Sequence, residues 1–194
     1  MKVLALDVST TTTGFAIINN NSKLIEYGQF SIKDRPLSDT LYAYSITEKS
    51  LKLAKKHQVD NIIIENIYYA SNPEYFRTWA RVHGGIAVQW YKKTRKEPIF
   101  MMAVVARPKI GINGKANKIE IQLEIAKRFK LIKDEKYYDF CSKFNELLKQ
   151  KKAKQLTRNQ FDYRVKKLSE NFEKEINLSE HQADSIVLGL AYFR

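Results

Sequence analysis

Four side chains that bind divalent cations well stand where secondary structure elements are expected to begin or end. Asp7 follows an apolar run at the amino terminus, and Glu65 follows a short β-branched run. His181 and Asp184 are three residues apart, so they share one face of a helix. A carboxylate among apolar residues is costly unless it is paired or bound to a cation. The four residues therefore predict a site for divalent metal ions.

The chemistry that such a site supports is phosphodiester hydrolysis. In the two-metal mechanism, ions roughly 4 Å apart generate a hydroxide nucleophile and stabilise the leaving oxygen. Carboxylate oxygens suit Mg²⁺ or Mn²⁺, and one imidazole excludes neither ion. We therefore predict two Mg²⁺ ions per active site, with Mn²⁺ as a substitute. His181 could instead activate or position the attacking water, because its pKa lies near physiological pH.

Each of these residues also has a simpler explanation. Asp7 could cap the threonine-rich turn that follows it, and Glu65 could pair with a basic residue such as Arg77. His181 and Asp184 could be ordinary first-turn residues of a helix, where an acid interacts favourably with the helix dipole. The joint occurrence of all four favours the metal interpretation.

The spacing of apolar residues predicts a mixed α/β sheet that positions these side chains. Strands are expected at 3–6, 15–18, 24–32, 61–64 and 99–105, and helices at 39–57, 73–92, 118–129 and 179–193. The β-branched run before Glu65 is typical of a strand buried on both faces of a parallel sheet. Such a strand delivers Glu65 to the carboxyl edge of the sheet.

One domain, residues 1–194, is expected from the length of the chain. The segment 133–177 is dense in Lys and Glu and predicts two amphipathic helices that turn near residues 154–157. This pair is a helical insertion before the last helix, for which Ser179 is the expected N-cap.

The charge of the chain indicates a polyanionic partner. There are 34 Lys and Arg residues against 21 Asp and Glu, a formal net charge of +13. Solvated basic helix faces would explain the same excess. Cys141 is the single cysteine and cannot form an intramolecular disulfide, and the sequence has neither a signal-peptide pattern nor an apolar run of membrane length. We expect a soluble cytoplasmic protein without membrane contact.

Three segments, 4–18, 64–68 and 181–186, resemble in this order the acidic motifs of RuvC-type Holliday junction resolvases. The resemblance covers roughly residues 1–131 and 179–193 and implies the ribonuclease H-like fold, a mixed sheet flanked by helices. It also implies that the metal ligands are Asp7, Glu65, His181 and Asp184.

The resemblance further implies residues that contact DNA. Tyr68 matches a family aromatic that stacks on bases at the junction centre, although a core-packing tyrosine would look the same. Arg107 and Lys118 match basic positions near the scissile phosphate, with Lys118 as a catalytic residue. Lys109 and Lys115 add charge in the same glycine-containing loop, which could also be merely solvated.

The function implied by the resemblance is endonucleolytic resolution of four-way DNA junctions by a homodimer that makes paired nicks. The insertion leaves open a flap or fork preference within the same fold. A less favoured alternative is an ATP-binding protein of the actin-like or sugar-kinase type, because residues 7–14 also resemble their first phosphate loop.

Overall fold

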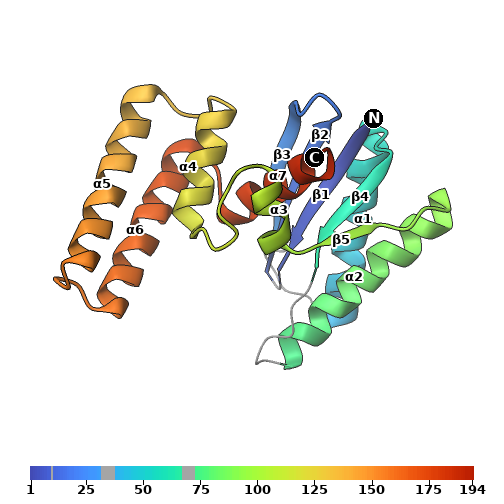
Figure 1. Ribbon diagram of the computed structural model, residues 1–194. Coiled ribbons are helices and arrows are strands. Elements are labelled where there is room, and N and C mark those ends of the chain that lie inside the picture. The colour runs from blue at the N-terminus through green and yellow to red at the C-terminus, as the bar shows by residue number, and fades with distance from the viewer. Residues whose placement is uncertain (10, 32–37, 67–72) are drawn as a thin grey trace.

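The computed structural model describes residues 1–9, 11–31, 38–66 and 73–194. Within them the chain forms a five-stranded mixed sheet with the strand order β3-β2-β1-β4-β5 (Figure 1). Strands β1 (Lys2–Val8), β2 (Thr12–Asn19) and β3 (Leu24–Ser31) are antiparallel neighbours, whereas β4 (Asn61–Glu65) and β5 (Ile99–Met101) extend the sheet in parallel from β1. The predicted mixed α/β sheet is confirmed.

Helices cover both faces of this sheet. They are α1 (Asp39–His57), α2 (Pro73–Thr94), α3 (Ala103–Lys109), α4 (Lys118–Arg128), α5 (Asp134–Lys152), α6 (Arg158–Ile176) and α7 (Glu180–Tyr192). Alternate residues of a strand point to opposite faces. Leu4, Leu6 and Ile64 accordingly join a buried cluster with α1 and α2, while Ala5 and Ile63 join a second cluster that contains α4 and α7.

The predicted central strand at 99–105 is wrong in its length and its position. Strand β5 ends at Met101 and lies at the edge of the sheet, and the chain continues as helix α3. Ala103 and Ala106 are buried at helical spacing, whereas Val104 and Val105 are exposed. A short apolar run does not distinguish a strand from a helix, and the pattern of burial decides for the helix here.

The two amphipathic helices predicted within residues 133–177 are present as the hairpin of α5 and α6. It packs against α4 and lies to the side of the sheet (Figure 1). Phe140, Phe144, Leu168 and Phe172 are buried in the cluster shared with α4 and α7. The hairpin is therefore part of the continuous core.

A buried polar network also ties the hairpin to the helix that carries His181 and Asp184. Gln122 on α4 donates from Nε2 to the Leu178 carbonyl oxygen at 2.8 Å, and its Oε1 accepts from the Ser169 hydroxyl on α6. Because Leu178 directly precedes the N-cap of α7, one side chain fixes α6 and the start of α7 against α4. No helix in the described ranges is long and apolar enough to cross a membrane.

Candidate active site

Asp7 and Glu65 lie side by side at the carboxyl edge of the sheet. Strands β1 and β4 are parallel and pair Leu6 with Ile64, so the next residue of each strand reaches the same edge. The two carboxyl groups are hydrogen-bonded to each other. Asp7 is only 6% exposed. The register of β1 and β4 alone therefore brings together two of the four predicted metal ligands.

Gly14 brings the start of α7 onto this edge. It is the cross-strand partner of Asp7 on β2, and a Cβ built on it would lie 2.1 Å from the His181 carbonyl oxygen. Only glycine permits this approach, because a Cβ would overlap the backbone of α7. The sequence prediction placed residue 14 only at the end of a segment that resembles a phosphate loop, and did not foresee this role. A glycine inside a strand pattern was the available signal.

The first turn of α7 is fixed by a capping box. The Ser179 hydroxyl accepts from the Gln182 N–H, and the Gln182 side chain accepts from the Ser179 N–H. His181 and Asp184 then face the sheet edge together. His181 Nδ1 lies 2.6 Å from Asp7 Oδ2.

Arg107 pairs with the fourth residue of the site. Its Nη2 donates to Asp184 Oδ1 at 3.1 Å, and its Nη1 donates to the carbonyl oxygens of Gly114 and Ala116. The guanidinium thereby links the α3–α4 loop to α7. Asp7, Glu65, His181 and Asp184, which lie far apart in sequence, converge at one edge of the sheet as the sequence analysis expected.

Burial and like charge dominate the electrostatics of the carboxyl groups. Burial, together with the neighbouring Asp7, raises the pKa of Glu65 to about 10. Burial also raises the pKa of Asp184 to about 6, although the adjacent Arg107 opposes the shift. Burial acts to raise the pKa of Asp7 as well, but the hydrogen bonds with His181 and Glu65 outweigh it and lower that pKa. Without a bound cation the site therefore keeps Glu65 protonated near neutral pH, because a third ionised carboxylate beside Asp7 and Asp184 would be costly.

This donor set fits a divalent cation. Three carboxylates and one imidazole are ligands that Mg²⁺ or Mn²⁺ accepts, and a bound cation would remove the cost of ionising Glu65 and Asp184. In the described part of the chain, no group of three or more His, Cys, Asp or Glu side chains has the arrangement of a complete metal site. Asp7 with His181 and Asp184 with Arg107 occupy each other instead. A cation would replace these pairings.

The other predicted site residues lie at different distances from this centre. Lys118, at the start of α4, forms an ion pair with Glu180 at the start of α7. Lys115 is exposed in the loop that Arg107 holds. Tyr68 lies outside the described residues.

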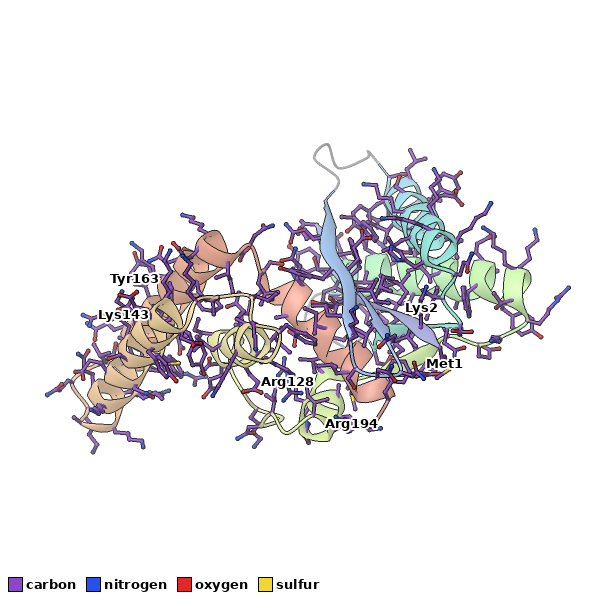
Figure 2. All side chains as sticks on the ribbon, turned by 90° about the horizontal axis from the view of Figure 1, so that it is seen from above. Met1, Lys2, Arg128, Lys143, Tyr163 and Arg194 are labelled. Carbon is purple, nitrogen blue, oxygen red and sulfur yellow. The ribbon has the colours of Figure 1, made fainter. Side chains whose placement is uncertain are left out.

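Lys109, by contrast, lies away from the candidate active site. It lines a cavity of about 510 Å³ with Leu190 and Arg194, at the end of α7 remote from His181. Figure 2 labels Arg194 together with Arg128, which lines the same cavity. The expectation that Lys109 lies with Lys115 in the glycine-containing loop is wrong, because Lys109 is on helix α3 and Lys115 alone of the two is in the loop.

His83 on α2 supports the site from behind, a structural role whose contact with Glu65 the sequence did not reveal. Its Nε2 lies 2.9 Å from the Glu65 carbonyl oxygen, and its Nδ1 lies 2.7 Å from the Trp79 carbonyl oxygen. The ring is buried. His83 thus ties the end of β4 to α2, and its distance of 18 residues from Glu65 gave no signal in the sequence.

A mixed sheet of this topology, with acids at the ends of β1 and β4 and on the last helix, defines a ribonuclease H-like nuclease. Residues 3–142 match the family model described as crossover junction endodeoxyribonuclease RuvC. The curated RuvC of Aliarcobacter butzleri is 30% identical over 142 residues, which cover 72% of this chain and 90% of that protein. The RuvC of Campylobacter lari is 31% identical over 145 residues, or 72% of this chain and 88% of that protein. The chain belongs to the RuvC family of crossover junction endodeoxyribonucleases.

Solved structures agree on the fold. The structure of T. thermophilus RuvC in complex with Holliday junction substrate aligns with a TM-score of 0.64 at 11% identity, covering 100% of this chain and 93% of that one. A second T. thermophilus RuvC structure aligns with a TM-score of 0.63 at 12% identity, and the alignment covers 100% of this chain and 94% of that one. The protein is a Holliday junction resolving endonuclease of a metal-dependent family.

The family match ends at residue 142, inside α5. Most of the hairpin and all of α7 therefore lie beyond it. The position of His181 and Asp184 beside Asp7 comes from the structure, through the capping box and the close approach at Gly14.

Proposed function

We propose that the protein resolves four-way junctions as a homodimer, with two Mg²⁺ ions held in each active site by Asp7, Glu65, His181 and Asp184. The observation that carries the proposal is the convergence of these four side chains from β1, β4 and α7. Mn²⁺ suits the same donors. When bound, the ions supply the hydroxide nucleophile and stabilise the leaving oxygen.

The cationic residues around the site have a separate role. Lys118 and Arg107 pair with Glu180 and Asp184, on two adjacent turns of α7. A phosphate at the site would compete for both cations, which would then offset the negative charge that grows in the transition state. His181 holds Asp7 by a hydrogen bond in the absence of cation. The alternative to its role as a metal ligand is that its imidazole orients the attacking water. Tyr68 and Lys115 remain proposed DNA contacts.

Dimerisation matches the symmetry of the substrate. A four-way junction has two equivalent strands to cut, and a twofold dimer presents two equivalent active sites. The face formed by α1 and α2 is the proposed contact. There Tyr44 and Val88 are exposed and line a cavity of about 480 Å³ with Gly84 and Gly85.

A substrate panel tests the proposed junction preference. Four-way junction, fork, flap and linear duplex DNA of matched sequence are incubated with the protein and Mg²⁺. We expect paired, symmetric nicks in the four-way junction and at least about tenfold slower cutting of the others, a difference of about 1.4 kcal/mol in transition-state free energy. Faster cutting of a flap or fork would move the protein to that substrate class, and equal cutting of linear duplex would remove structure selectivity.

The ATP-binding alternative loses its main support. Gly14, which ends the segment that resembles a phosphate loop, is covered by the backbone of His181 and Gln182. Its lack of a side chain is used to seat α7. The space that a nucleotide phosphate would need at this glycine is occupied by protein.

Glu65→Gln tests the charge balance of the site without DNA. Because folding raises the pKa of Glu65 from 4.5 to about 10, its carboxyl costs stability as the pH rises above 4.5. Gln keeps the hydrogen-bonding shape of the protonated acid and removes this cost. In EDTA at pH 7 we expect the variant to be more stable than wild type by about 1–3 kcal/mol in urea unfolding, yet inactive with Mg²⁺.

The pH dependence separates this cause from a packing effect. The stability advantage of Glu65→Gln should shrink as the pH falls and vanish near pH 4.5, where the unfolded-state carboxyl also takes up a proton. An advantage that stays constant between pH 4.5 and 8 would show that a buried acid is not its source.

A further inference from the structure

The end of the α5–α6 hairpin is strongly basic and contains no acid. We call residues 147–161 the hairpin tip. Between Glu146 and Asp162 the chain has no Asp or Glu, and the basic residues there are Lys149, Lys151, Lys152, Lys154 and Arg158. All of them are exposed. Figure 2 shows side chains extending outward along the hairpin, which the labels of Lys143 and Tyr163 locate.

Three cations along the body of the hairpin have a carboxylate partner. In the part of the chain that the structure describes, Arg158 is the one tip cation with such a partner, and Lys151 lies over the Phe161 ring. The paired cations and their partners are Lys136 with Glu175, Lys143 with Asp139 and Lys166 with Glu170. Among the described residues, no carboxylate lies within ion-pairing distance of Lys149, Lys152 or Lys154. Arg158 lies 3.8 Å from Asp162, and an ion pair this exposed, like that of Lys166 with Glu170, contributes little. The charge of the tip is therefore available to an external partner.

Local stability does not explain all of this charge. Lysines at the end of α5 interact favourably with the helix dipole, which accounts for Lys149, Lys151 and Lys152. Arg158, however, is in the first turn of α6, where an acid would be favoured and none is present. Lys154 has a φ of +56°, a conformation that favours glycine or asparagine. The charges of Lys154 and Arg158 are therefore not explained by local stability.

The tip is held at a fixed place relative to the active site. Phe172 is fully buried, and Gln122 bonds both α6 and the residue before the α7 N-cap. Helix α5 has 19 residues, so the tip stands about 28 Å from the base of the hairpin. In Figure 1 the tip and the carboxyl ends of β1 and β4 lie toward the same, lower side of the molecule. A long substrate on the active site could extend toward the tip.

We propose that the hairpin tip binds the phosphate backbone of one duplex arm of the junction, away from the scissile phosphate. Duplex DNA carries about one negative charge per 1.7 Å along its axis, so exposed unpaired lysines bind it without reading sequence. The inference rests on the nuclease activity of the family and is independent of which residues hold the metal. The tip lies outside the residues that match the family model.

The test compares two variants with the same loss of charge. The tip variant carries Lys149→Gln, Lys152→Gln, Lys154→Gln and Arg158→Gln. The control variant carries Lys23→Gln, Lys52→Gln, Lys55→Gln and Lys93→Gln, which are exposed and lie outside the residues that line the proposed dimer contact. Junction affinity is measured over a range of salt concentrations, and single-turnover cleavage is measured at saturating protein.

The tip variant should bind a junction with long arms about 10- to 100-fold more weakly than the control, with a log affinity against log salt slope shallower by about 2–3. Its cleavage rate at saturation should equal that of wild type. Arms cut to about 6 base pairs span roughly 20 Å, which is shorter than the hairpin itself. On such junctions the proposal predicts that wild type and tip variant bind alike. Melting temperatures establish that both variants are folded.

Equal affinity and equal salt slope for the tip and control variants would overturn the proposal, as would a loss of affinity that persists on the short-armed junction. If the two variants have equal affinity and salt slope, the basic residues of the hairpin tip would instead serve to bind a protein partner. Failure of wild type to cut junctions is a separate outcome, which concerns the resolvase assignment and not the tip.

Discussion

Asp7→Asn is expected to abolish junction cleavage while leaving junction binding intact. Asp7 is the residue shared by the pairings of the site, because it contacts both Glu65 and His181. Asn retains the size of the side chain but removes the negative charge that a divalent cation needs. We expect single-turnover cleavage to fall at least about 10³-fold, equivalent to about 4 kcal/mol of transition-state free energy.

Cation-dependent stability provides a second readout for the same variant. A ligand that binds only the folded state raises its melting temperature. Mn²⁺ should therefore stabilise wild type and have little effect on Asp7→Asn. A variant that cuts junctions within tenfold of wild type, or that Mn²⁺ stabilises as strongly, would contradict a metal-binding role for this aspartate.

Gly14→Ala is expected to damage both folding and catalysis, although glycine carries no functional group. The added Cβ would lie 2.1 Å from the His181 carbonyl oxygen and 2.8 Å from the Gln182 nitrogen, both backbone atoms that cannot rotate away. The start of α7 must then move off β2. Overpacking of this kind costs about 3 kcal/mol or more. Displacement of His181 and Asp184 by about 1 Å should lower the cleavage rate about 10²-fold.

Gly84→Ala is the matched control for the stability of the monomer, measured below the concentration at which the protein dimerises, because Gly84 lies on the proposed dimer face. It adds the same methyl group in the interior of α2, where a Cβ meets nothing within 4 Å. Alanine is the better helix former, so this change should raise stability by about 0.5–1 kcal/mol in urea unfolding. If Gly14→Ala were as stable and as active as wild type, the close approach of α7 to β2 could not be what positions the site.

Four of the five strands and the ends of most helices followed from local pattern, whereas the strand predicted at 99–105 did not. The bounds of β4 and α1 were visible as a β-branched run and as an amphipathic segment that ends near His57. Ser179 was visible as an N-cap, because a small polar residue precedes an apolar helix. The positions of Asp7 and Glu65 followed in turn, since parallel strands end at one edge of a sheet.

Contacts between distant segments were not visible in the sequence. The pairing of Arg107 with Asp184 joins residues 77 apart, and it depends on α3 being a helix where a strand was expected. The helical conformation of α3 also separates Lys109 from Arg107, because side chains two residues apart on a helix point to different sides. The role of Gly14 depends on the backbone of His181 and Gln182 that packs against it, and no local sequence pattern encodes this contact.

Anomalous scattering from Mn²⁺ in crystals of the protein tests the metal assignment most directly. The expected result is two manganese peaks in each active site, both within coordination distance of oxygen or nitrogen atoms from Asp7, Glu65, His181 and Asp184, with Arg107 released from Asp184. Peaks bound elsewhere, or no peak at a Mn²⁺ concentration that supports cleavage, would contradict it.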